Sequence, residues 1–426
     1  MRGTPRLGFL VVALAFGACG EDDGTVSIVT GEETDVFTRD PAPVTLLTET
    51  VAIDGSKKEH SRTPLPTATV DLGDLKRSDI GGIAITGLGA DGKALVKGES
   101  LLVQWGALEA QSLQVFAQRT GELARVPNGP PAAAVAMPVM VEGRFILATN
   151  GTSTFLYDLL QLRTLSGRPT LPRPAKSLAS FASSALLIDE EGASSFDLTS
   201  GYTQAIPAPA NGSFAEVAGG ARVGVPGGAQ IVVGATRIGD GGPSARVLLV
   251  DAAGVLTFAS LVAPREGACA VYVEGRGLVV YGGDAAASGA EVLAPGATLA
   301  TPLPFPPDPI ERCAATALDG THVLVAGGDG GPARVLDLTC TTACAPVAWS
   351  GAIPLVRADA ADLAPDAALV VGDDAAGATH VYRASPGELR EVPLKNPRRG
   401  ARLVRAPANG LAIVGGDAPG IEMYRE

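Results

Sequence analysis

The sequence predicts an all-β fold of the β-propeller class, and a repeat carries this prediction. Short apolar runs end at a glycine pair or its equivalent, and these positions recur every 39 to 48 residues. That period suits four short strands with their turns, the size of one propeller blade. The runs are continuous and β-branched, as in Ile231-Val232-Val233, which is typical of strands buried on both faces. The first positions of the glycine slots are Trp105, Asn150, Asp189, Gly234, Gly282, Gly327, Gly372 and Gly415.

Two further columns of residues repeat with the same register. A strand after each slot holds a large apolar residue: Phe116, Tyr157, Phe196, Leu249, Leu293, Leu336, Tyr382 and Tyr424. Arginines open the strand before the last glycine slots, namely Arg265, Arg312, Arg357 and either Arg398 or Arg399. Because these three sets of positions recur with the same period, they indicate eight repeat units. An eight-bladed ring is therefore favoured, and a seven-bladed ring with one degenerate unit outside it is the alternative.

These marks resemble the kelch-repeat family. The resemblance is closest over residues 265–426 and rests on the arginine-opened strands, the glycine pairs, the Asp319-Gly320 turn and aromatic-Asp steps such as Tyr157-Asp158. It implies a kelch-type β-propeller whose blades each have four antiparallel strands. The outer-strand tryptophan of the family appears here only as Trp349.

The ring needs a strand from elsewhere in the chain. The last unit ends at Glu426, just after its third strand. Without a fourth strand the ring would keep an exposed sheet edge. We expect an N-terminal strand from residues 44–72 to close it, so that the propeller spans residues 44–426.

The N-terminus has the features of an exported chain. Arg2 and Arg6 precede ten apolar residues that end at Phe16, a run too short to span a bilayer and suited to a secretory signal. Small residues stand directly before Cys19 and resemble a bacterial lipoprotein processing site, although the family usually has an aliphatic residue where Phe16 lies. The resemblance implies a signal peptide over residues 1–18 and lipidation of Cys19. Ordinary signal cleavage beside an incidental cysteine is the alternative.

The segment after Cys19 has no apolar periodicity. Acidic residues alternate with glycine and threonine over residues 19–43, which predicts an acidic flexible tether. The expected location is the bacterial cell envelope, with the protein held by lipid at the outer membrane and facing the periplasm or the cell surface.

Four further cysteines fit an oxidising compartment. Cys340 and Cys344 lie in one segment between two strands and are expected to form a disulfide. Cys269 and Cys313 occupy nearly equivalent positions in adjacent repeats, and their state is left open. A zinc site is less favoured, because the spacings lack a paired C-x-x-C pattern.

Charge and motif content exclude several functions. The chain has a formal charge of −12, whereas nucleic-acid binding needs a basic surface. The three histidines, His60, His322 and His380, are too scattered for a catalytic or ligand set. No zinc-protease, nucleophile-elbow or phosphate-loop pattern is present. We therefore expect no catalytic residues, no cofactor and no metal.

The arginine column supplies one candidate binding site. If Arg265, Arg312, Arg357 and Arg399 start the innermost strands, they line one mouth of the central channel. A ring of guanidinium groups would bind a carboxylate or a phosphate. The favoured alternative is that each arginine pairs with an acidic residue of a neighbouring blade.

Two classes of function fit this sequence. The favoured one is a monomeric, surface-anchored lipoprotein whose propeller is a non-catalytic binding module for a protein or glycan. The low aromatic content, 4%, favours a protein over a sugar that stacks on aromatic rings. The alternative is a propeller-type hydrolase or lyase that acts on an extracellular polymer with carboxylates from different blades.

Overall fold

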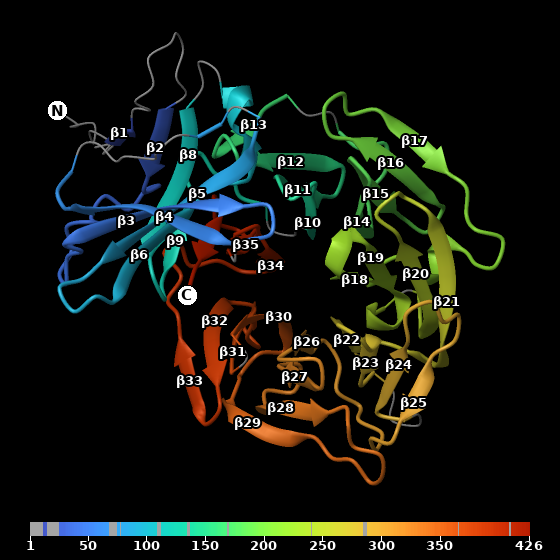
Figure 1. Cartoon of the computed structure of the whole chain (residues 1–426). Coiled ribbons are helices and arrows are strands. Elements are labelled where there is room, and N and C mark those ends of the chain that lie inside the picture. The colour runs from blue at the N-terminus through green and yellow to red at the C-terminus, as the bar shows by residue number, and fades with distance from the viewer. Residues whose placement is uncertain are drawn as a thin grey trace, which may run out of the picture.

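The computed structural model shows a ring of β-sheets with a second sheet attached to its side (Figure 1). It describes residues 12–14, 25–67, 75–76, 78–108, 112–133, 137–167, 170–239, 241–283, 288–364, 366–408 and 410–426.

Six blades of the ring are each built from four consecutive antiparallel strands. The first is β10 (Met137–Val141), β11 (Phe145–Asn150), β12 (Ser153–Asp158) and β13 (Arg163–Leu165); the second is β14 (Ser177–Phe181), β15 (Ser184–Ile188), β16 (Ala193–Asp197) and β17 (Thr203–Ile206); the third is β18 (Ala221–Gly224), β19 (Gln230–Val233), β20 (Ser244–Val250) and β21 (Leu256–Arg265). The fourth is β22 (Cys269–Val273), β23 (Gly277–Tyr281), β24 (Ala290–Leu293) and β25 (Thr301–Leu303); the fifth is β26 (Ala314–Ala317), β27 (His322–Ala326), β28 (Pro332–Asp337) and β29 (Val347–Ala352); the sixth is β30 (Arg357–Ala364), β31 (Ala367–Asp373), β32 (Thr379–Ser385) and β33 (Glu388–Glu391).

The second strand of each blade explains the apolar runs of the sequence. Every residue of β19, β23 and β35 (Leu411–Val414) is buried, because blades cover both faces of these strands. The predicted slots Asn150 to Gly415 fall at or next to the ends of these second strands, and the large apolar residues Tyr157 to Tyr424 fall on the third strands. The repeat register is therefore correct for seven of the eight units.

The seventh blade closes the ring. It contains β34 (Arg402–Arg405), β35, β36 (Glu422–Tyr424) and, from the other end of the propeller sequence, β9 (Leu123–Arg125). β9 pairs with β36 in antiparallel register, with Leu123 opposite Tyr424. A strand that precedes the first blade does close the ring, but the expected donor from residues 44–72 is wrong.

The eighth unit is part of a separate N-terminal sheet, so the preference for eight blades is wrong and the seven-bladed alternative is confirmed. The sheet contains β1 (Val12–Leu14), β2 (Thr25–Val29), β3 (Thr45–Ala52), β4 (Lys57–Pro64), β5 (Ile80–Leu88), β6 (Ala94–Glu99), β7 (Val103–Gln104) and β8 (Ser112–Arg119). β5 pairs with β3 on one side and β6 on the other. A strand enclosed on both edges cannot be the innermost strand of a blade, which leaves one edge toward the channel. Trp105 begins a short 3-10 helix, η1 (Trp105–Leu108), instead of ending a blade strand.

Two predicted boundaries also differ from the structure. The propeller, expected over residues 44–426, begins at β9. Residues 25–43 were expected to belong to a flexible tether, yet β2 pairs in parallel with β8, and Val26, Ile28 and Val36 are buried. Apolar side chains spaced two apart on β2 allow it to join the sheet core. Cys19, the signal segment outside 12–14 and residues 68–74 lie outside the described residues.

Hydrogen bonds attach the N-terminal sheet to the seventh blade. Gln118 Nε2 donates to the carbonyl of Met423 at 2.9 Å, and Lys97 Nζ donates to the carbonyl of Glu426 at 2.6 Å. Arg125, on the closing strand, pairs with Glu33 at 2.9 Å. The C-terminus therefore lies against the N-terminal sheet and next to the closing strand (Figure 1). None of the helices in the described segments combines the length and apolar character needed to cross a bilayer.

Candidate functional site

Along most of the innermost strands, which border the central channel, a partly exposed residue is followed by a buried one. On the innermost strand of each blade, one residue pairs with the second-strand residue that lies two places before the glycine slot. In six blades this innermost-strand residue is partly exposed: Pro138, Arg222, Ala270, Ala315, Ala360 and Leu403. The next residue is buried in five of these blades: Val139, Val223, Thr316, Ala361 and Val404. Alternate side chains of a strand point to opposite sides. The first set is the more exposed side of these innermost strands, which border the channel, and we call it the channel layer.

Arg222 is the one charged residue of the channel layer. Its Nη1 donates to Gln230 Oε1 at 3.0 Å, and no carboxylate among the described residues lies within ion-pair distance of it. Burial lowers the pKa of Arg222 to about 10, while the negative charge of Asp359 acts in the opposite direction. Arg222 is on β18 of the third blade and Asp359 on β30 of the sixth. The charge of Asp359 therefore acts on Arg222 from a blade that is not its neighbour.

Asp359 attracts two more arginines, although neither makes a hydrogen bond with it. Arg402 Nη1 lies 3.6 Å from Asp359 Oδ1, and Arg357 Nη1 lies 3.6 Å from Oδ2. These distances are too long for hydrogen bonds. The backbone amide of Leu403 donates to Oδ2 at 3.2 Å. Burial also lowers the pKa of Arg402, with Asp359 again opposing the shift.

Asp373 is bound tightly, in contrast to Asp359. It accepts hydrogen bonds from Arg357 Nε at 2.7 Å, from Thr379 Oγ1 at 2.8 Å and from the amide of Gly400 at 3.1 Å. Arg357 Nη2 also donates to the carbonyl of Ala401 at 2.7 Å. Nη1 of the same guanidinium is buried and has no hydrogen-bond partner. Arg357 thus fixes the wall between the sixth and seventh blades and keeps one donor free.

These five groups form one cluster, which we call the arginine end: Arg222, Arg357, Arg402, Asp359 and Asp373. Three guanidinium groups and two carboxylates leave one excess positive charge, in a chain whose formal charge is −12. Three residues further along β30, about 10 Å away, Asp362 forms an ion pair with Arg405 and is neutralised by it. The positive charge of the channel is therefore concentrated at the arginine end.

Of the four arginines predicted to line the channel mouth, only Arg357 belongs to this cluster. Arg265 ends β21, the outermost strand of the third blade, and is completely buried. Its Nη2 lies 2.9 Å from Glu291 of the fourth blade, and its Nη1 donates to the carbonyl of Gly282 at 2.8 Å. This is the pairing that the alternative interpretation predicts. Arg312 is exposed and lies before β26 with a φ of 57°.

Arg398, and not Arg399, is the counterpart of Arg265 in the seventh blade. Its Nη2 lies 2.9 Å from Glu422, and its Nη1 donates to the carbonyl of Gly415 at 3.1 Å. Arg399 is exposed, and its backbone amide bonds to Asp417. In both blades the arginine thus joins a third-strand glutamate to the first glycine of the pair. Arg399 was therefore the wrong choice between two adjacent arginines.

Sequence reasoning missed Arg222, Arg402 and Asp359. The signal that would reveal them is positional: in the channel layer Arg222 replaces the alanine found at Ala270, Ala315 and Ala360. Each of the six channel-layer residues lies 12 positions before its glycine slot, so the slots alone could have located this column. The slots do not show which residues of the column meet across the ring.

Both pairs of cysteines form disulfides. Cys340 and Cys344 are joined as predicted, with a Cα–Cα distance of 5.8 Å. Cys269 on β22 is joined to Cys313, directly before β26, with a Cα–Cα distance of 5.3 Å. The Cys269–Cys313 disulfide connects the innermost strand of the fourth blade to the residue that directly precedes the innermost strand of the fifth. In the described ranges, no group of three or more His, Cys, Asp and Glu side chains is arranged to hold a metal.

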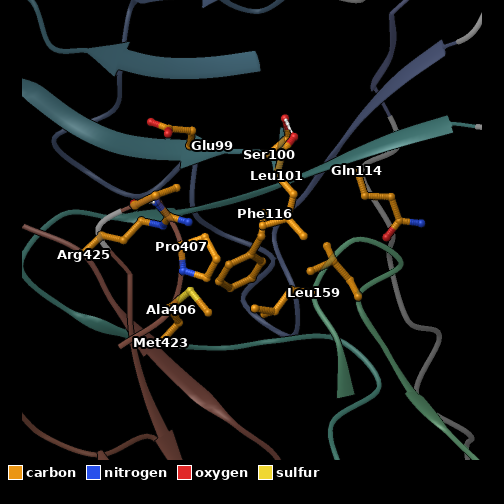
Figure 2. Close-up of a pocket in the computed structure, with 12 residues that line it drawn as sticks. Glu99, Ser100, Leu101, Gln114, Phe116, Leu159, Ala406, Pro407, Met423 and Arg425 are labelled. Carbon is orange, nitrogen blue, oxygen red and sulfur yellow. Dashed lines mark hydrogen bonds between the residues drawn. The ribbon is translucent and has the colours of Figure 1, made fainter. Parts of the chain in front are cut away.

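A small cavity lies where the N-terminal sheet meets the first and seventh blades. Phe116, Leu159, Met423 and Pro407 contribute its apolar lining, and Glu99 and Arg425 lie at its polar side (Figure 2). Its volume is about 30 Å³, room for a water molecule or two. This cavity is a packing defect at a joint and is too small for a ligand.

The fold and the channel define a seven-bladed β-propeller, and comparisons with known proteins add no family. No family model and no curated protein matches the chain. Among solved structures, the chain is similar to the WD40 domain of Pan2 from Neurospora crassa, with 12% identity, coverage of 70% of this chain and 90% of that one, and a TM-score of 0.43. It is also similar to virginiamycin B lyase from Staphylococcus aureus, with 12% identity, coverage of 71% and 97%, and a TM-score of 0.45. YCF48 from Cyanidioschyzon merolae matches with 11% identity, coverage of 72% and 99%, and a TM-score of 0.43.

Proposed function

We propose that this chain is a lipid-anchored, non-catalytic binding protein of the bacterial cell envelope, and that it presents the arginine end of its channel to a protein or glycan partner. The arginine end carries this proposal, because it is a positive site whose hydrogen-bond donors are not all used within the protein. Rigid inner strands hold the site, and this arrangement favours recognition over rearrangement.

The compartment follows from the cysteines. Two disulfides are typical of extracellular or periplasmic proteins. Lipidation of Cys19 would hold the protein at a membrane, and the preferred location is the outer membrane. The propeller is proposed to be kelch-like, because the arginine, glutamate and glycine contacts recur in the fourth and seventh blades.

The carboxyl groups with shifted pKa values give no support to hydrolase or lyase chemistry. A general acid needs a raised pKa. Hydrogen bonds from nearby turn hydroxyls and amides lower the pKa values of Asp319, Asp337 and Asp374. The other shifted carboxyl groups in the described ranges also shift downward, namely Asp54, Glu59, Asp91, Asp197 and Glu426. A hydrolase or lyase stays the second candidate, with Asp359 as its channel carboxylate.

The anchor is tested by metabolic labelling of the full-length chain with a palmitate analogue. The wild type should be labelled and found with membranes, and Cys19→Ser should lose both properties. Unchanged labelling and fractionation of the Cys19→Ser protein would reject the lipid anchor.

The binding face is tested by photo-crosslinking in intact cells. Two variants are made, each with one photoreactive amino acid. In the first it replaces Ala221, which is exposed next to Arg222. In the second it replaces Val347, which is 66% exposed on the outer strand β29. Adducts should form at Ala221 and not at Val347, and mass spectrometry identifies them as protein or glycan. Adducts confined to Val347 would place the binding surface on the blade edge and reject the channel face.

A further inference from the structure

We propose that the arginine end is a carboxylate-binding subsite, in which Arg222, Arg402 and Arg357 receive an acidic side chain of a protein partner. This inference rests on the proposed binding function and specifies its chemistry.

The first argument is the imbalance of donors and acceptors. Arg222 uses one guanidinium nitrogen, on Gln230. Arg402 has Asp359 at 3.6 Å and no closer carboxylate in the described chain, and Nη1 of Arg357 is buried without a partner. Asp373 is saturated by its three donors and is not available to them. An additional carboxylate would supply the missing acceptors, and guanidinium groups bind carboxylates with planar, charge-assisted hydrogen bonds.

The second argument is space. The channel-layer residues Ala270, Ala315 and Ala360 carry single methyl groups and are partly exposed. In this layer Arg222 is accompanied by short side chains, which favours an approaching group that is itself short, such as the side chain of a glutamate.

The third argument is charge. The arginine end has one excess positive charge, which matches a single carboxylate. A phosphate dianion would meet Asp359 and Asp373 and exceed that charge. Because burial lowers the pKa values of Arg222 and Arg402, both cations are held where water stabilises them poorly. Both remain protonated at neutral pH, and a bound anion would offset the lost hydration.

The fourth argument selects a peptide over an acidic sugar. Carbohydrate sites commonly offer an aromatic face, whereas the channel layer contains alanine, proline, leucine and one arginine. Guanidinium groups alone recognise a carboxylate without reading a sugar ring. The protein source is therefore the one that we adopt.

The test measures ligand binding to full-length protein in detergent by saturation-transfer NMR. The probes are two blocked tripeptides, acetyl-Gly-Glu-Gly-amide and acetyl-Gly-Gln-Gly-amide, with glucuronate and inorganic phosphate as alternative anions. The glutamate peptide should bind, and the glutamine peptide should bind at least about tenfold more weakly, because a charge-assisted hydrogen bond is lost. Equal binding of the two peptides would overturn the subsite. Tighter binding of glucuronate or phosphate would overturn the peptide source.

Variants locate the subsite within the molecule. Arg222→Gln and Arg402→Gln should each weaken binding of the glutamate peptide by about tenfold. The matched control Arg163→Gln removes the same charge from an exposed position on β13, the outermost strand of the first blade, and should leave binding unchanged. Thermal unfolding of each variant shows that the ring is intact. Unchanged affinity in both channel variants would reject the proposal. If crosslinking at Ala221 persists while the peptide fails to bind, the binding function stands and the carboxylate chemistry is wrong.

Discussion

Arginines stand in two contrasting settings in this propeller. At the blade interfaces, Arg265 and Arg398 are completely buried, and each has a glutamate at 2.9 Å and a glycine carbonyl within reach. At the channel, Arg222 and Arg402 are partly exposed and lack a carboxylate within hydrogen-bond distance. Buried, paired arginines hold the blades together, whereas the channel arginines make no comparable contribution to the ring. The difference teaches that a buried arginine with a paired glutamate serves packing and that a partly exposed arginine without one is the better candidate for binding.

The largest effect is expected from breaking an interface pair. Arg398→Met leaves Glu422 buried without its counter-ion and removes donors from Gly415, so the free energy of unfolding should fall by about 3–5 kcal/mol. Chemical denaturation measures the change. The adjacent, exposed Arg399 provides the control, because Arg399→Met should change stability by less than about 0.5 kcal/mol. Similar losses in the two variants would erase the contrast between paired and unpaired arginines.

The disulfides give a second measure of how the interfaces are held. Cys269–Cys313 closes a separation of 44 residues and Cys340–Cys344 one of 4 residues. The loop-entropy model predicts losses of about 4 and about 2 kcal/mol when each is replaced by two serines. Thermal unfolding of the two double variants ranks them. A larger loss from Cys340→Ser with Cys344→Ser would show that the interblade link contributes less than a local loop.

The channel arginine should behave in the opposite direction. Burial lowers the folded pKa of Arg222 to about 10, below its unfolded value, so the charged group disfavours the folded state at all pH values below 10. Arg222→Met should therefore raise stability at pH 7 by about 1 kcal/mol, and the gain should shrink as the pH rises above 10. Denaturation at pH 7 gives the sign. A loss of 3 kcal/mol or more, as large as that of Arg398→Met, would make Arg222 a structural residue.

The smallest effect is expected from a surface ion pair. A hydrogen bond from the His380 ring to Glu391 raises the pKa of His380, and Asp374 acts in the same direction. The stabilisation is fully present below the unfolded pKa of about 6.5 and is lost as the pH rises through the higher folded pKa. Because the side chain is 30% exposed, the contribution should stay under about 1 kcal/mol. His380→Gln should lower the melting temperature at pH 5.5 and have little effect at pH 8.5. An equal drop at both pH values would show that packing on Tyr382, and not charge, explains the loss.

The fold was predictable from the sequence wherever a local pattern determines it. Glycine pairs and continuous apolar runs predict second strands such as β23 and β35, because tight turns require glycine and burial on both faces requires apolar residues. Which strands pair with each other does not restrict residue type in this way. The hairpin of β5 and β6 has the length of half a blade, and its pairing with β3 and β8 depends on contacts across the N-terminal sheet.

The candidate site was predictable only in part for the same reason. The arginine column identified a repeated contact, in which the segment that leads into a blade, at Arg265 or Arg398, binds the third-strand glutamate and the first glycine of that blade. Asp359 of the sixth blade acts electrostatically on Arg222 of the third, although the two are separated by 137 positions in the chain. No spacing rule connects such residues, because their proximity results from closing the ring.

The pairing of β9 with β36 has a consequence for how the protein is made. Leu123 of β9 and Tyr424 of β36 are paired although they are about three hundred residues apart in the chain, so the ring cannot close until β36 has been synthesised. Six blades can form before that point, but the seventh cannot. A chain that stops before Glu422 would keep β9 and β35 as open edges, which are sites for aggregation and proteolysis. Closure by β9 and β36 therefore acts as a test that synthesis has passed β36, since only then are both of these edges paired.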